Sequence, residues 1–198
     1  MGFSDIFKAS ELDATLASYQ KKTAKKPVKK QETPGPKGKE RISKDEYYLQ
    51  IAKTVALRST CLRRKYGAIV VRNDIIVSSG YNGAPRGQIN CCDIGICKRE
   101  HLHIPHGERY ELCRSVHAEQ NAVIAAGYEK TYGATLYLAG IDAQTEQLID
   151  APDCCMMCKR VIINSRIERV IFLNGDGSHR MATTADWVHE GGAYDEEA

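Results

Sequence analysis

The sequence has no hydrophobic run that approaches the roughly 18–20 residues needed to span a membrane. Its amino terminus, MGFSDIFKAS, also lacks the charged and then apolar layout of a signal peptide. We therefore expect a cytoplasmic protein. Hydrophobic residues make up 42% of the 198 residues, an ordinary value for a globular domain, and this argues against wholesale disorder.

An excess of positive charge is missing from most of the chain, although the net charge is +3. Residues 1–40 hold nine lysines and five acidic residues, a net charge of +4, whereas residues 41–198 carry −1. A neutral body argues against a nucleic-acid-binding surface. Residues 21–40 are rich in Lys, Pro and Gly, so we expect 1–40 to be a basic, largely disordered N-terminal extension before a folded domain over 41–198.

The spacing of apolar and turn residues predicts an α/β fold. Ser43 and Glu46 have the spacing of a capping box before an amphipathic helix over 44–59. Two short apolar runs around Arg72-Asn73-Asp74 predict a β-hairpin. The remaining expected segments are a long loop over 82–114, a helix over 117–126, a strand over 134–139, a polar insertion over 140–152, a helix near 155–165, a strand over 169–173, and a last helical turn or two within 176–198.

This order predicts a three-layer α/β/α sandwich with a mixed sheet of about five strands. The strands over 134–139 and 169–173 are joined through a helix, so they should be parallel.

The chain has eight cysteines but no export signal. In a reducing cytosol such cysteines are metal ligands, catalytic groups or core residues more often than disulfides. Cys155 and Cys158 form a C-x-x-C at the start of a predicted helix, where the helix dipole favours thiolates. With His117 they make three zinc ligands and leave the fourth tetrahedral position for water, as in a catalytic site.

His117 and Glu119 are two residues apart, so they would not share one side of a helix. A metal that lies off the helix end removes this difficulty. His117 can then bind the ion while Glu119 reaches the open position and moves protons.

The pair H-x-E and P-C-x-x-C is the signature of zinc-dependent deaminases. Here Pro152 is followed by Asp153 and Cys154 instead of by the first cysteine of C-x-x-C. We expect Cys155 and Cys158 to bind the metal. Cys154 in place of Cys155 is the alternative.

Beyond the metal motif, the chain resembles the deoxycytidylate (dCMP) deaminase family over about residues 44–174. The resemblance rests on RSTCLRRKYGAIVV, SSGYNGAPRG, NCCD, ELCRSVHAEQNAVI, GATLYL and CMMCKRVIINSRIERVIF. It implies a cytidine-deaminase-like fold and a zinc-dependent hydrolase that converts dCMP to dUMP and ammonia and so feeds thymidylate synthesis. It also implies homo-oligomers, often hexamers, that dCTP and dTTP regulate.

The resemblance implies roles for single residues. Zinc would be held by His117, Cys155 and Cys158, and Glu119 would take a proton from water, protonate the ring N3 and deliver a proton to the departing amine. We expect the substrate-binding residues to be Asn82, Ala118, Arg63 and Arg86, with Arg64 a further candidate for the phosphate. Asn82 in Asn-Gly also suits a plain turn after a strand, and the arginines also suit a solvated surface.

A second metal site is suggested by the long loop, which holds four cysteines and three histidines, His101, His103 and His106. A loop of this length without a core needs a staple, and soft ligands suit zinc. Cys61 has a spacing that resembles that of phage dCMP deaminases with a structural zinc. The favoured set is Cys61, Cys97 and Cys113, with Cys91 or a histidine as the fourth ligand; free thiols and an exposed loop are the alternative.

Two other functions stay open on the sequence. One is a deaminase of another substrate, such as a tRNA adenosine, free cytidine or CMP, because the insertion GIDAQTEQLIDAPD replaces the short segment usual at the substrate pocket. The other is a non-catalytic zinc-binding module, against which the intact Glu119 argues.

Overall fold

The computed structural model describes residues 41–105 and 107–192, so the predicted extension over 1–40 lies outside the described residues. Five strands form one sheet in the order β2-β1-β3-β4-β5. Only β3 and β4 run parallel within it, and the other neighbours are antiparallel. The strands are β1 (Arg64–Arg72), β2 (Ile75–Tyr81), β3 (Thr135–Asp142), β4 (Arg169–Leu173) and β5 (His179–Thr183). The predicted mixed sheet and the parallel pair are confirmed.

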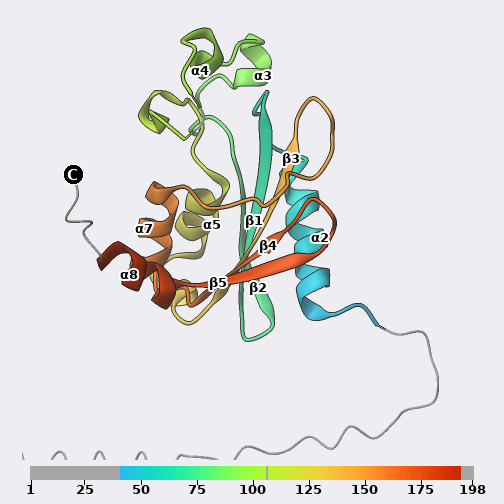
Figure 1. Cartoon of the computed structure of the whole chain (residues 1–198), viewed down its shortest axis with the longest axis vertical. Coiled ribbons are helices and arrows are strands. Elements are labelled where there is room, and N and C mark those ends of the chain that lie inside the picture. The colour runs from blue at the N-terminus through green and yellow to red at the C-terminus, as the bar shows by residue number, and fades with distance from the viewer. Residues whose placement is uncertain (1–40, 106, 193–198) are drawn as a thin grey trace, which may run out of the picture. The chain divides into compact units, whose positions relative to one another are not determined.

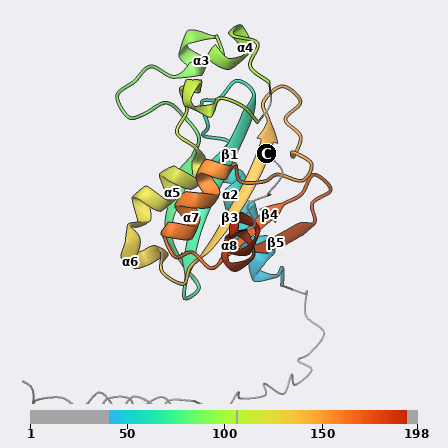
Figure 2. The ribbon, with the colours of Figure 1, turned by 60° about the vertical axis from the view of Figure 1, so that its left-hand side comes forward.

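Helices cover both faces of this sheet (Figures 1 and 2). Helix α2 (Lys44–Ala56) packs its Leu49 and Ala52 on one face, against strand residues such as Ile69. Helices α5 (Ala118–Ala126) and α7 (Met156–Asn164) pack on the other face with α8 (Thr184–Gly192). The predicted three-layer sandwich is therefore confirmed.

Two glycines allow the helices to approach the sheet closely. A Cβ atom on Gly67 would lie 2.2 Å from the carbonyl oxygen of Ala52 in α2. On the opposite face, a Cβ atom on Gly80 would lie 2.4 Å from the backbone nitrogen of Ala122 in α5. Any larger residue at either position would therefore push a helix away from the sheet.

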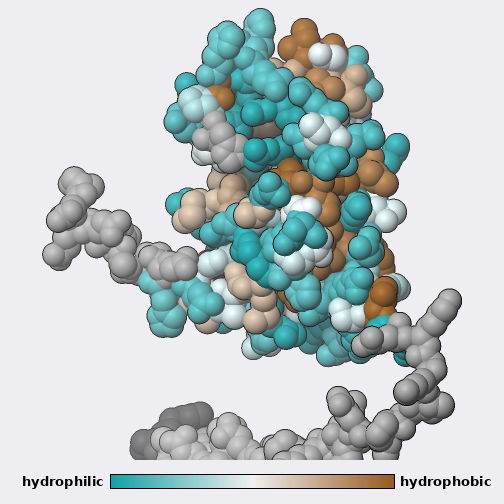
Figure 3. Space-filling model, turned by 45° about the vertical axis from the view of Figure 1, so that its right-hand side comes forward, coloured by the Kyte–Doolittle hydropathy of each residue, from teal (hydrophilic) through white to brown (hydrophobic). Residues whose placement is uncertain are grey.

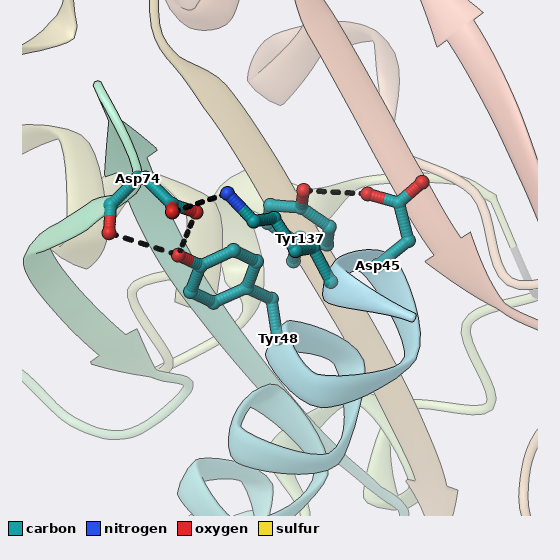
Figure 4. Close-up of polar contacts among 5 residues, drawn as sticks. Asp45, Tyr48, Asp74 and Tyr137 are labelled. Atoms are coloured by element: carbon teal, nitrogen blue, oxygen red, sulfur yellow. Dashed lines mark hydrogen bonds and ion pairs between the residues drawn. The ribbon is translucent and has the colours of Figure 1, made fainter. Parts of the chain in front are cut away.

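The start of α2 is fixed by polar contacts. The Ser43 hydroxyl accepts a hydrogen bond from the Glu46 backbone N–H at 3.1 Å, as the capping spacing predicted. Tyr48 of α2 donates its hydroxyl to the carboxylate of Asp74 in the β1–β2 turn at 2.8 Å. Tyr137 of β3 donates to Asp45 at 2.7 Å, so polar contacts join the helix to the β1–β2 turn and to β3 (Figure 4).

The structure also differs from the expected elements. The first helix ends at Ala56, before the predicted residue 59. Strand β5 was not foreseen, because HRMAT has no fully buried residue and lies at the sheet edge. The predicted loop contains α3 (Cys91–Ile94), α4 (Lys98–His101) and the 3-10 helix η1 (Tyr110–Leu112), and α6 (Tyr128–Thr131) follows α5. No helix in the described part of the chain is long and apolar enough to cross a membrane.

Candidate metal centre and cavity

The candidate metal centre lies where two helices begin. His117 is the N-cap residue of α5 and has an extended backbone, with φ −72° and ψ 155°. Cys155 is the N-cap residue of α7, also extended, and Cys158 follows in the first turn of that helix. Because His117 precedes the helix and Glu119 lies inside it, their two-residue spacing does not require a shared helix side. This agrees with the expectation of a metal off the helix end.

The three side chains lie close enough to share one ion. Nδ1 of His117 is 3.4 Å from Sγ of Cys155 and 3.3 Å from Sγ of Cys158. Within residues 41–105 and 107–192, these three residues form the one group whose potential ligand atoms all lie within 4.8 Å of one another. One imidazole nitrogen and two sulfurs suit tetrahedral zinc and leave one position open.

The surroundings of the thiols favour a ligand form. The hydrogen bond with Cys158, and then that with His117, lowers the pKa of Cys155 to about 4 despite burial. The same contact with Cys155 raises the pKa of Cys158. The positive end of the α7 dipole adds to the stabilisation of a thiolate at this place.

Cys154 lies in a different environment from Cys155. Its side chain is 4% exposed and belongs to the core between the sheet, α5 and α7. Burial and the charge of Glu119 raise the pKa of Cys154 well above its ordinary value. The structure thus brings Cys155, and not the alternative Cys154, to His117.

Glu119 lies in the first turn of α5 and is 5% exposed. Burial raises the pKa of its carboxyl group. Glu119, His117 and Cys155 line one cavity of about 450 Å³, a volume suited to a small molecule. A buried carboxyl group beside a metal-binding group is an arrangement for proton transfer to a bound ligand.

The polar insertion forms one wall of this cavity. Strand β3 extends to Asp142, whose carboxylate accepts hydrogen bonds from the backbone of Gln144 and Thr145 at 2.9 Å. The chain then returns, and Ile149 donates to the carbonyl of Gly140 at 3.0 Å. Residues 149–153 line the cavity, so the part of the sequence that departs most from the family pattern borders the site.

Only some of the predicted substrate-binding residues line the cavity. Asn82 and Arg63 line the cavity. Asn82 is buried, and its side chain donates to the carbonyl of Arg64 at 2.9 Å and accepts from the backbone of Tyr66 at 2.7 Å. Ala118 is wholly buried in the core, Arg86 is exposed, and neither lines the cavity. A structural role for Asn82 is therefore evident, and contact of any of the four residues with a substrate stays a prediction.

The cavity residues that sequence reasoning missed include Arg99, Tyr110 and Tyr66. Tyr66 occupies a strand position, where a tyrosine gives no functional signal. Arg99 and Tyr110 lie in the long loop, whose path was not predictable from periodicity. The position of Tyr110 seven residues before His117 was the one available hint, and it is weak.

The four loop-associated cysteines approach one another without forming a compact group. Cys61, Cys97 and Cys113 line the same cavity. Burial first, and then the charges of these three thiols, raises the pKa of Cys91. Their sulfur atoms do not meet the 4.8 Å criterion that the His117 group meets within the described residues. His106 lies outside the described residues.

Comparison with known proteins agrees with the geometry. Residues 42–174 match the family model for the cytidine and deoxycytidylate deaminase zinc-binding region. A deoxycytidylate deaminase of Mycobacterium phage D29 is 37% identical over 133 residues, which cover 65% of this chain and 92% of the phage protein. One of Schizosaccharomyces pombe is 39% identical over 90 residues, which cover 46% of this chain but 28% of the yeast protein.

Among solved structures, a dCMP deaminase of cyanophage S-TIM5 has a TM-score of 0.45 and 28% identity, and the match covers 66% of this chain and 82% of that one. The family match spans well over half of the chain and includes each residue of the metal-binding group. The chain therefore belongs to the cytidine and deoxycytidylate deaminase zinc-binding family.

Proposed function

We propose that this protein hydrolyses dCMP to dUMP and ammonia, and so supplies dUMP for thymidylate synthesis. The observation that carries the proposal is the buried carboxyl group of Glu119 in one cavity with His117 and Cys155. A non-catalytic zinc module would need no such carboxyl group. Relatives from a phage and a yeast are named deoxycytidylate deaminases, and this favours dCMP over other substrates that carry an amino group.

The roles of the residues follow from their places. His117, Cys155 and Cys158 would hold zinc, which when bound supplies a Lewis acid that makes water nucleophilic at neutral pH. Glu119 accepts a proton from the attacking water as its oxygen bonds to C4, and passes that proton to the ring N3. Glu119 then takes the remaining proton from the hydroxyl group formed on C4. As the C4=O bond forms and the C4–N bond breaks, it delivers this proton to the amine, which leaves as ammonia.

The nucleotide end of the substrate requires cationic donors. Arg63 and Arg64 line the cavity, and the Arg63 Nε is 3.0 Å from a carboxylate oxygen of Glu100, which is half exposed. A 5′-phosphate can replace this exposed partner as an acceptor. We therefore assign the phosphate to this side of the cavity and the sugar to the side of Asn82.

Ammonia release from a panel of substrates tests the proposal. The purified protein is incubated with dCMP, CMP, cytidine, dCTP, single-stranded DNA and a tRNA substrate. We expect dCMP to be deaminated most rapidly. Preferred release from cytidine or tRNA would favour the corresponding alternative, and a zinc-loaded protein that is inert on all of them would favour a binding module.

We also propose a second, structural zinc held by Cys61, Cys91, Cys97 and Cys113. Cys61 precedes β1 while the others lie in the long loop, so a shared ion would fix that loop to the sheet. The Cys113 sulfur already accepts a hydrogen bond from the Ser115 backbone N–H at 3.5 Å. Metal analysis should give two zinc ions per chain and one for Cys113→Ser; one ion in the unchanged protein would contradict the second site.

Three further expectations complete the proposal: a homo-oligomer, a hexamer by resemblance; regulation by dCTP and dTTP; and a cytoplasmic location. Hydrophobic residues gather along one side of the face drawn in Figure 3. Separately, large apolar side chains with high exposure include Ile75 of β2 at 64% and Ile124 of α5 at 74%. Such surface is typical of an interface between subunits. Light scattering with and without dTTP would measure both the mass and its response, and a monomer under all conditions would contradict this expectation.

A further inference from the structure

Within the part of the chain that the structure describes, no protein group holds the second nitrogen of the His117 imidazole by a hydrogen bond. Nδ1 faces the sulfurs of Cys155 and Cys158. A metal-binding histidine usually donates its other N–H to a carboxylate, carbonyl or water, which fixes the ring. Among residues 41–105 and 107–192, no protein group makes a hydrogen bond with Nε2 of His117.

An aromatic contact takes the place of that hydrogen bond. The rings of Tyr110 and His117 meet edge to face, with centroids 5.3 Å apart and planes at 82°. This geometry is favourable for aromatic pairs, because the positive edge of one ring meets the negative face of the other. A T-shaped contact also restricts rotation of the imidazole about the Cβ–Cγ bond of His117.

Tyr110 is in turn held by a buried arginine. The guanidinium carbon of Arg99 lies 4.6 Å from the centroid of the Tyr110 ring, a cation–π distance. Arg99 is 6% exposed, and its Nη2 donates to the carbonyls of Pro105 at 2.7 Å and Glu108 at 2.5 Å. Its buried Nε has no hydrogen-bond partner within the described residues.

We infer that Tyr110 is a positioning residue that keeps the His117 imidazole directed at Cys155 and Cys158, and that Arg99 acts through Tyr110 by fixing its ring. The inference rests on the proposed zinc site. It assigns a functional reason to the loop that leads into the start of α5. Loss of the Tyr110 ring would allow the imidazole to rotate, so zinc would bind more weakly because the ligand must first be ordered.

A rival role for Tyr110 is contact with the substrate, since the residue also lines the cavity. The two roles predict different measurements. A substrate wall changes KM for dCMP and leaves the zinc affinity of the substrate-free protein unchanged. A positioning residue changes the zinc affinity without any substrate present.

The test compares Tyr110→Leu with Tyr110→Phe, which keeps the ring and removes a hydroxyl that makes no hydrogen bond with another described residue. Tyr128→Leu is the matched control, because Tyr128 is a 59% exposed tyrosine on α6 outside the cavity. Zinc affinity of the metal-free full-length chain is measured by competition with a chelator, and the Co²⁺ absorption spectrum reports ligand geometry. We expect Tyr110→Leu to weaken zinc binding about 10- to 100-fold and to alter the Co²⁺ spectrum, with Phe and the control within about twofold.

Unchanged zinc affinity in Tyr110→Leu would overturn the inference, and so would an equal loss in Tyr110→Phe. If Tyr110→Leu does not fold, Arg99→Met carries the test: weaker zinc binding supports the inference, and unchanged binding overturns it. A protein that binds zinc as expected but does not deaminate dCMP would contradict the proposed function alone, because these readouts need no substrate.

Discussion

At the scale of single residues, the site depends on which side of a helix boundary each side chain falls. His117 and Cys155 are N-cap residues with extended backbones, so their side chains point beyond the helices that follow. Glu119 and Cys158 lie within the first turns and are buried. Residues that lie far apart in the sequence therefore form one compact site, because the starts of α5 and α7 lie close together.

Replacement of Glu119 should separate turnover from metal binding. Glu119→Gln keeps the size of the side chain but cannot accept the proton from water, so we expect kcat to fall about 10²- to 10⁴-fold or more. Zinc content should stay at the level of the unchanged protein, because no ligand is removed. Near-normal turnover in Glu119→Gln would exclude this residue as the proton carrier.

The adjacent cysteines should respond oppositely to substitution. Cys155→Ala removes an atom that lies 3.4 Å from His117 Nδ1, so we expect loss of catalytic zinc and of activity. Cys154→Ala removes a buried core thiol, so it should lower thermal stability while zinc remains bound. Zinc content and melting temperature of both variants show which of the two cysteines binds zinc. Zinc loss in Cys154→Ala alone would identify Cys154 as the ligand in place of Cys155.

At the scale of elements, one face of the sheet packs against α2 and the other packs against the helices that begin at the metal centre. Helix α2 packs closely on one face of the sheet at Gly67 of β1. On the other face, α5 packs closely at Gly80 of β2, and the N-cap residue of α5 is His117 of the metal centre. Both glycines approach helix backbone closely. Substitution of each one can therefore distinguish an effect on stability from an effect on the geometry of the metal centre.

We expect Gly67→Ala and Gly80→Ala each to lower the free energy of unfolding by about 1–3 kcal/mol or more, because a Cβ atom would collide with helix backbone. Only Gly80→Ala displaces α5, so only this variant should also bind zinc more weakly. Denaturant unfolding and chelator competition measure the two effects. Equal zinc affinity in both variants would show that the α5 position does not control the site.

The tie between α2 and the hairpin turn should make stability depend on pH at both extremes. Burial, followed by the hydrogen bond to Asp74, raises the pKa of Tyr48 to about 12. A raised tyrosine pKa stabilises the fold below the ordinary value of 10.0, and this contribution disappears as the pH rises through about 12. Hydrogen bonds from Lys44 and then Tyr48 lower the pKa of Asp74, so its contribution is present above 3.8 and is lost at lower pH.

Tyr48→Phe removes the hydroxyl that titrates, so its melting temperature should fall less steeply between neutral pH and about pH 12 than that of the unchanged protein. Thermal unfolding at a series of pH values measures this. Parallel curves for the two proteins would contradict the pKa assignment of Tyr48.

At the scale of the whole molecule, the elements with strong periodicity were predictable and the connections were not. The hairpin, the parallel strands and both metal-site helices followed from apolar spacing and turn residues such as Gly127, which ends α5. Strand β5 was missed because the residue types in HRMAT do not alternate between apolar and polar. Whether such a segment becomes an edge strand depends on its packing against the rest of the sheet. The local sequence does not reveal that packing.

The same limit applies to the site. His117, Cys155 and Cys158 were predictable because metal ligation restricts residue types and spacing. The choice between Cys154 and Cys155 needed the start of α7 at Met156, which fixes the direction of each thiol. Arg99 and Tyr110 could not be found, since the path of the long loop that brings them to His117 has no periodic pattern in the sequence.

The central claim is that zinc at His117, Cys155 and Cys158 together with Glu119 converts dCMP to dUMP. The most direct measurement is the rate of dUMP formation from dCMP while metal-free protein is titrated with zinc, beside Glu119→Gln as the control. We expect a rate that rises with occupancy of the His117 site and then levels off, with no rise in the control. Full activity before zinc is added, or none at any zinc concentration, would contradict it.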